Sequence, residues 1–152
     1  LSLCAPLSET QARWKPDPEN WSILEVLNHL LIEERLDFRS HLGAIFRKSQ
    51  VFWPEIDPQN WEKEKAEEQS SLAQILLDFK SERETSIAWL KALQDPDWEA
   101  TISFKQGSLS AGDLLASWLA HDLLHLRQLV TLQYQLTAKE SQPFDVEYAG
   151  EW

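Results

Sequence analysis

Apolar residues recur every three or four positions in three long stretches of the chain, with polar residues between them. This is the period of an amphipathic α-helix that buries one face. Two of the stretches begin with a serine followed three residues later by an acidic residue, which is the spacing of a capping box. The pattern predicts long helices over Ser22 to about Lys48, Ser71–Gln94 and Ser110 to about Thr137.

The remaining segments are shorter and richer in proline. Leu7–Trp14 is expected to form a helix of a few turns at most, ended by the prolines that follow it. The charged stretch Trp61–Gln69 fits either a frayed helix or an ordered loop. Trp98–Phe104 alternates apolar and polar residues, but a lone short strand would have no partner, so we interpret it as a linker. The pattern as a whole predicts an all-α helix bundle with an irregular tail after Ala138.

Composition supports one folded unit and excludes several kinds of partner. A chain of 152 residues, 43% of them hydrophobic, suits one domain over residues 1–152. The formal net charge of −11 would repel nucleic acid and anionic lipid surfaces. No apolar run reaches the roughly 20 residues of a membrane span. The single cysteine, Cys4, cannot form an internal disulfide, so we expect a cytoplasmic protein.

The last long helix carries two histidines where apolar side chains are expected. In the run HDLLH, His121 and His125 are four residues apart, which sets them about 40° apart around the axis and about 6 Å along it. Both imidazoles can therefore reach one metal ion. Polar rings inside an apolar stripe need partners for their nitrogens. A metal ion would supply such a partner, and a carbonyl or carboxylate beside each buried histidine would do so equally well.

A third histidine lies near the middle of the first long helix. His29 stands among Leu27, Leu30 and Leu31, at a depth that can match that of His121 and His125. Three histidines from two facing helices are an arrangement that builds a metal site inside a bundle. The residues leave two interpretations open: one shared metal site, or three separately satisfied histidines.

Other polar residues near these histidines are weaker candidates. His41 would lie about 18 Å beyond His29 along a regular helix, so we expect it at the surface. Three further polar residues are placed to orient a ligand, to bind a substrate or simply to face solvent: Glu33, Asp122 and Gln128. The sequence assigns no catalytic residue.

Two segments resemble the signature regions of the DinB-like (YfiT-like) superfamily. They are WSILEVLNHLLIEE, from Trp21 to Glu34, and GSLSAGDLLASWLAHDLLHLRQL, from Gly107 to Leu129. The resemblance implies a four-helix bundle with up-up-down-down order and a divalent metal, nickel, zinc or iron, on His29, His121 and His125. The family's first long helix should precede the Trp-Ser start, where only about 21 residues are available, so that helix is expected to be short or incomplete.

The resemblance also suggests activities and partners. Relatives include transferases and isomerases that use a low-molecular-weight thiol, and metal-dependent hydrolases, which an ion with an open coordination position would serve. The alternative is a non-catalytic, stress-related bundle whose metal is structural or absent. Family habit and the eight tryptophans suggest a homodimer, with Trp53, Trp61 and Trp152 as interface candidates.

Overall fold

The computed structural model is mainly helical, and it describes residues 2–48, 70–104 and 107–150. A short helix, α1 (Glu9–Ala12), precedes one long helical rod made of α2 (Ile23–Ile32), a π-helical segment η1 (Glu33–Phe38) and α3 (Arg39–Phe46). The other long helices are α4 (Leu72–Ala92) and α5 (Ala111–Glu140). A 3₁₀ turn, η3 (Glu147–Ala149), lies in the tail. The described residues do not include the charged stretch Trp61–Gln69 or the interface candidates Trp53, Trp61 and Trp152.

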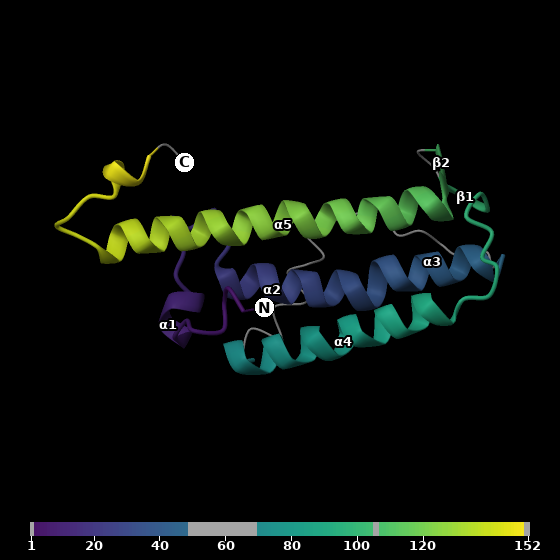
Figure 1. Ribbon diagram of the computed structural model, residues 1–152, viewed down its shortest axis with the longest axis horizontal. Coiled ribbons are helices and arrows are strands. Elements are labelled where there is room, and N and C mark those ends of the chain that lie inside the picture. The colour runs from purple at the N-terminus through teal and green to yellow at the C-terminus, as the bar shows by residue number, and fades with distance from the viewer. Residues whose placement is uncertain (1, 49–69, 105–106, 151–152) are drawn as a thin grey trace.

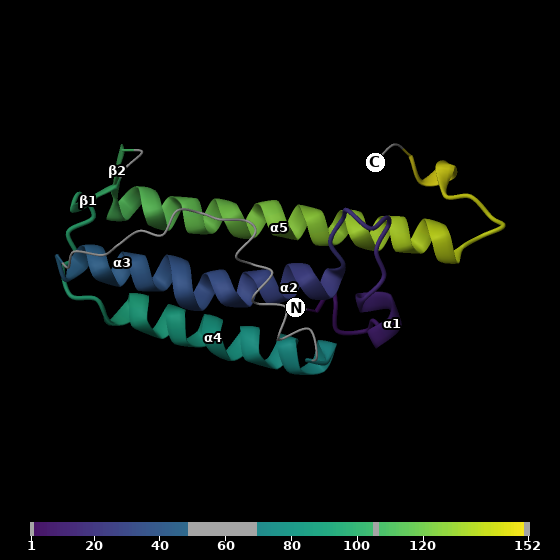
Figure 2. The same cartoon turned by 180° about the vertical axis from the view of Figure 1, so that it is seen from behind.

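The long helices lie side by side, with the α2–η1–α3 rod between α4 and α5 (Figures 1 and 2). The rod and α4 run parallel, whereas α5 runs antiparallel to both. Ser22 and Ser110 cap their helices through the capping boxes that the sequence predicts, with Glu25 and Asp113 as the third residues. The predicted helices are thus confirmed, and each boundary differs by no more than a few residues.

The core consists of two apolar clusters, one toward each end of the bundle. At one end α1 and α2 pack against the start of α4 and the later part of α5, where Leu27, Ile75 and Leu132 are buried. At the other end α3 packs against the start of α5, where Leu42 and Trp118 are buried. Ile23, Leu27 and Leu30 all face the interior, as the period predicts.

The expectation of a plain linker before α5 is wrong. Thr101–Phe104 forms strand β1, which pairs antiparallel with β2 (Gly107–Ser110), in the register Thr101 to Ser110. The partner strand lies immediately after β1, so a hairpin satisfies the pairing that a lone strand would lack. The backbone N–H of Gly112 donates to the Trp98 carbonyl at 3.0 Å, which ties the hairpin region to the first turn of α5.

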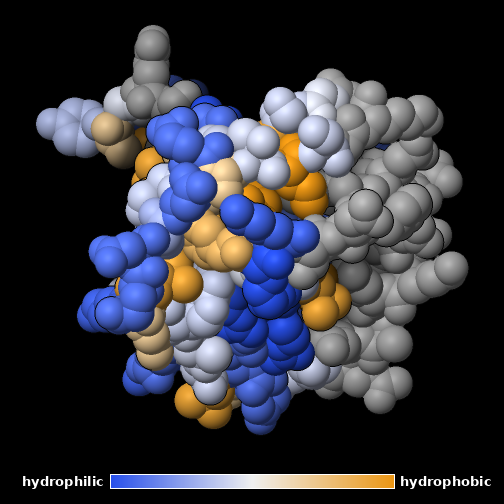
Figure 3. Space-filling view, turned by 90° about the vertical axis from the view of Figure 1, so that its right-hand side faces the viewer, coloured by the Kyte–Doolittle hydropathy of each residue, from blue (hydrophilic) through white to orange (hydrophobic). Residues whose placement is uncertain are grey.

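One end of the bundle carries many hydrophilic residues on its surface. Hydrophilic residues form a broad band over the described part of the bundle end where α3, α4 and the hairpin meet (Figure 3). No helix among the described residues is long and apolar enough to cross a membrane.

Candidate metal centre

His29 is placed by the start of α2. Ser22 accepts a hydrogen bond from the Glu25 backbone N–H at 3.2 Å, and the Glu25 carboxylate accepts one from the Ser22 N–H at 2.7 Å. This reciprocal cap sets where the helix begins and therefore which face each later residue presents. His29 comes two turns later on the buried face, and the residue is only 7% exposed.

His121 and His125 are placed by α5, which runs without a break from Ala111 to Glu140. They lie one turn apart on the face toward α2, and both are partly buried. Because α5 is antiparallel to the rod, the middle of one helix meets the middle of the other. The two histidines of α5 therefore reach the level of His29, between the two apolar clusters.

The three rings converge on one point. The His121 Nε2 atom lies 3.3 Å from His29 Nε2 and 3.1 Å from His125 Nε2. One ligand atom from each histidine fits within 4.8 Å of the other two. Two nitrogens bound to one ion at about 2.1 Å in tetrahedral geometry lie about 3.4 Å apart. The three histidines are therefore close enough together to hold one metal ion.

The protonation of the rings also suits a metal. Burial, together with the neighbouring charges of His125 and His121, lowers the pKa of His29 to about 3. Burial and the charge of His125 likewise lower the pKa of His121. Neutral imidazole is the form that binds a metal, since the lone pair must be available. The donor set thus fits a divalent transition metal in both geometry and charge.

Two of the predicted neighbours contact ligand rings and one does not. The His125 Nδ1 atom lies 2.8 Å from Gln128 Oε1, a contact that leaves His125 Nε2 as the free lone pair. Glu33 Oε1 lies 3.9 Å from His29 Nδ1. Asp122 instead pairs with Arg83 on α4.

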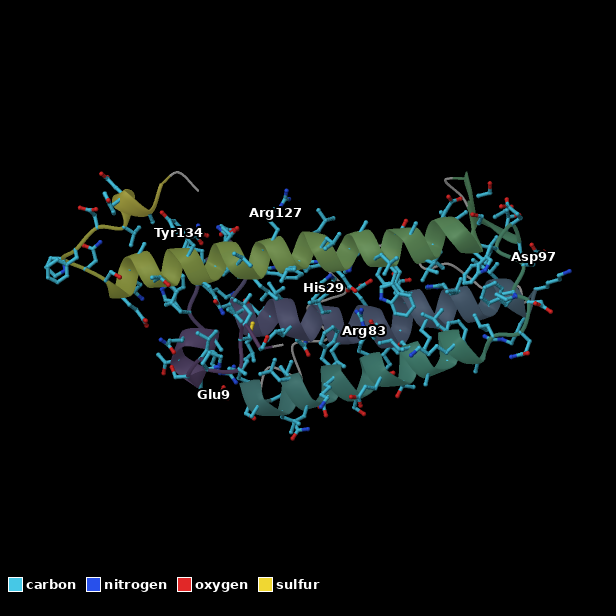
Figure 4. The ribbon with its side chains drawn as sticks, in the orientation of Figure 1. Glu9, His29, Arg83, Asp97, Arg127 and Tyr134 are labelled. Atoms are coloured by element: carbon cyan, nitrogen blue, oxygen red, sulfur yellow. The ribbon has the colours of Figure 1, made fainter. Side chains whose placement is uncertain are left out.

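A buried ion network beside the site was not predicted from the sequence. Arg83 on α4 lies 2.6 Å from Asp122 and 2.8 Å from the fully buried carboxylate of Glu34 (Figure 4). The indole N–H of Trp118 donates to the same Glu34 oxygen at 3.1 Å. A signal did exist, since Glu34 follows Leu30 by four residues and precedes Phe38 by four, and so interrupts the apolar stripe.

The expectation that His41 lies at the surface is also wrong. His41 is 6% exposed, and its Nδ1 contacts the Asp37 carboxylate. Asp37 in turn shares a side-chain hydrogen bond with Glu33, so His29, Glu33, Asp37 and His41 form a connected polar row. In a regular α-helix residues twelve apart are about 120° apart around the axis. The wider π turn of η1 brings His41 back into line with His29.

Aromatic side chains close two sides of the centre. The Trp21 ring lies 5.1 Å from the His29 ring and stacks at 6.5 Å on His125. On the other side the Phe38 ring lies 5.1 Å from His121 and stacks at 5.5 Å on Trp118. These rings limit how much water reaches the histidines, which strengthens electrostatic interactions within the site.

Comparison with known proteins agrees with this arrangement. A search of curated proteins finds no match to the chain. The family model described as the DinB superfamily matches residues 1–129, which include α2, η1, α3 and α4, and α5 as far as Leu129, four residues beyond His125. All three histidines lie within the match, and the mainly helical structure is consistent with it. The chain therefore belongs to the DinB superfamily.

Proposed function

We propose that this chain is a metal-dependent enzyme in which the Nε2 atoms of His29, His121 and His125 hold one divalent transition metal. The observation that carries the proposal is the convergence of the three nitrogens, at 3.1 and 3.3 Å along the two closest pairs. The described residues supply three ligands, one fewer than a closed tetrahedral structural site contains. Such an ion keeps at least one position for a reactant, which favours catalysis over a purely structural role.

Such a metal, when bound, supplies Lewis acidity that lowers the pKa of a thiol or a water molecule and so prepares a nucleophile near neutral pH. An activated thiol serves transfer or isomerisation, and an activated water molecule serves hydrolysis. Imidazole nitrogen is a ligand suited to zinc, nickel and iron, so we propose these metals as the cofactor.

The chain's own residues would support this chemistry in distinct ways. Gln128 fixes the orientation of the His125 ring through the 2.8 Å contact at Nδ1. Trp21 and Phe38 shield the histidines from bulk water on two sides. Burial keeps His29 neutral, so protons do not compete with the metal at neutral pH.

The proposal is tested by removing one histidine and counting metal. Native protein should contain about one equivalent of metal by elemental analysis, and His125→Ala should lose it while retaining its helical circular dichroism, since a lost ligand weakens the site more than the packing. His41→Gln is the matched control, because it removes the remaining histidine of the chain but leaves the three converging rings in place.

Undiminished metal binding by His125→Ala would refute the proposed site. Metal-loaded protein that turns over neither thiol-plus-electrophile pairs nor amide and ester substrates would instead favour the non-catalytic bundle.

A further inference from the structure

The outer side of α5 is bare along its middle. The helix lies at the edge of the helical layer, and no described helix runs along its outer side (Figures 1 and 2). The β hairpin lies near one end of this side and the tail near the other. A helix that borders water normally turns a polar face outward, so an apolar outer face indicates that another surface covers it.

The exposed residues in the middle of α5 are apolar. Seven positions are exposed between Asp113 and Arg127, and none of them carries a charge. Six of these seven are leucine or alanine. Leu119, Leu123 and Leu126 follow one another by four and then three residues, so they form a stripe along one side of the helix. Their exposed fractions are between 49% and 67%, which are high values for leucine in a helix that packs on a core.

The exposed side of α4, which lies at the other edge of the layer, has a different composition. It carries the charged residues Lys80, Glu84 and Lys91 among its apolar ones. Charged residues make up 26% of the whole chain. A stretch of α5 about 20 Å long with no exposed charge therefore departs from the pattern of this chain. It has the character of a contact surface rather than of a solvated face.

Opposite charges mark the two ends of this apolar face. Asp113 is exposed in the first turn of α5, where its carboxylate accepts hydrogen bonds from Ser110 and keeps further lone pairs available. Arg127 points away from the bundle interior and forms no ion pair with another described residue (Figure 4). Fourteen residues separate Asp113 from Arg127, so on a regular helix their side chains emerge about 40° apart, on the same side.

This arrangement is complementary to itself. When a two-fold axis relates two antiparallel helices, each end of one helix lies beside the opposite end of the other. Ala120 lies midway between Asp113 and Arg127. An axis near Ala120 would place the two leucine stripes against each other and bring Asp113 of each copy beside Arg127 of the other. Two identical ion pairs would then close the two ends of the contact.

A membrane surface fits the same face less well. Helices that lie on anionic membranes carry several lysines and arginines on their polar side. In α5, Arg127 is the one lysine or arginine before Lys139, and the chain has a net charge of −11. An anionic lipid surface would therefore repel this chain, whereas an uncharged contact face allows two copies to approach despite their like net charges.

We propose that two copies of this chain form a dimer through the outer faces of their α5 helices, packed antiparallel about Ala120. The three histidines lie on the inner side of α5, so the dimer goes beyond the proposed metal centre and does not depend on it. A face about 20 Å long and about 10 Å wide is at the small end of specific interfaces, so we expect a micromolar dissociation constant.

Sedimentation equilibrium tests the proposal over about 1–200 µM protein, a range that brackets a micromolar dissociation constant. The native mass should rise from 17.6 kDa toward twice that value as the concentration increases. Leu119→Glu and Leu123→Glu should each stay at 17.6 kDa, because a charge in the apolar centre raises the dissociation constant by about 100-fold or more. Circular dichroism checks that each variant is folded, and either one suffices if the other is not.

The matched control is Leu77→Glu. Leu77 is 63% exposed on α4, close to the 67% of Leu123, so the same substitution is made at an equally exposed leucine of a different helix. This variant should dimerise as the native protein does, since its charge lies outside the proposed contact.

Charge reversal tests the antiparallel arrangement. Arg127→Asp places like charges together at both ends of the contact, as Asp113→Arg also does, so each should raise the dissociation constant by about tenfold. In a mixture of the two variants, heterodimers regain opposite charges at both ends. The mixture should therefore associate about tenfold more tightly than either variant alone.

Three results would overturn the proposal. A mass of 17.6 kDa at every concentration would show that the native chain does not dimerise in this way. Dimers that persist in both Leu119→Glu and Leu123→Glu, or that are lost equally in Leu77→Glu, would show that α5 is not the contact. An Arg127→Asp variant that dimerises as tightly as the native protein would refute the antiparallel pairing.

Discussion

Arg83 is the position where a single substitution should affect stability most clearly. Among the residues that the structure describes, the Glu34 carboxylate contacts only the Arg83 guanidinium and the Trp118 indole, and Glu34 is 1% exposed. The second oxygen of Glu34, Oε1, has no hydrogen-bond partner in the described part of the chain. Replacing Arg83 with methionine keeps much of the aliphatic length but leaves this buried carboxylate without a counter-charge.

The loss of stability in Arg83→Met depends on how completely its partners, Glu34 and Asp122, are buried. Removing one member of a buried ion pair costs about 3–5 kcal/mol, since the remaining charge stays desolvated. Asp122, the other partner, has 27% of its side chain exposed and can regain water, so most of the cost should come from Glu34. A domain of this size is stable by about 5–15 kcal/mol, so Arg83→Met should remove a large part of that margin.

Urea unfolding followed by circular dichroism measures the effect. The control is Arg35→Met, because the Arg35 side chain is 45% exposed and its pair with Glu82 should contribute about 1 kcal/mol or less. Adding Glu34→Gln to Arg83→Met should restore much of the loss, since no buried charge then remains. A cost for Arg83→Met no larger than that for Arg35→Met, or a double variant no more stable than Arg83→Met, would contradict this reasoning.

Two further substitutions address the site and the interface between α4 and the rod. Gln128→Ala removes the contact to His125 Nδ1, so zinc affinity in a chelator competition should fall about 10-fold to 100-fold, and an unchanged affinity would show that Gln128 does not orient the ring. Burial raises the pKa of Glu82, but hydrogen bonds from Arg39 and Arg35 outweigh it and lower that pKa overall. Its stabilising effect is therefore present above the unfolded pKa of about 4.3 and is lost as pH falls through the lower folded value. Glu82→Gln should lower the free energy of unfolding by about 1–3 kcal/mol at pH 7, measured by urea unfolding. The difference in this free energy between the variant and the native protein should become smaller as the pH falls. A difference that does not change with pH would argue against the ion pairs.

The long helices and the three histidines could be predicted because both depend on local periodicity. A serine cap fixes the start of a helix, and the 3.6-residue period then fixes which face His29, His121 and His125 present. Their convergence required only that α5 run antiparallel to α2, which the family resemblance implies. Predicting that these histidines meet required no contact other than the packing of one helix against the other.

The remaining features depend on contacts that periodicity does not encode. The prediction for His41 assumed a regular α-helix, and the π turn at Glu33–Phe38 changes the angle at which every later residue emerges. The β hairpin depends on pairing with a strand that itself carries little strand pattern. Arg83 was unremarkable in sequence because its importance comes from Glu34 and Asp122, which lie on two other helices.

The π turn also explains how one short segment serves both the fold and the site. Glu33 and Glu34 are consecutive residues of this turn, so their side chains leave the helix in different directions and face different neighbours. Glu34 reaches Arg83 on α4, whereas Glu33 and Asp37 remain in the row beside His29. Glu34 is neutralised by Arg83 within the fold, whereas Glu33 contacts His29 of the candidate site. The two roles are thus separable by substitution: Arg83→Met should lower stability, whereas His125→Ala should abolish metal binding and leave the buried Arg83–Glu34 pair in place.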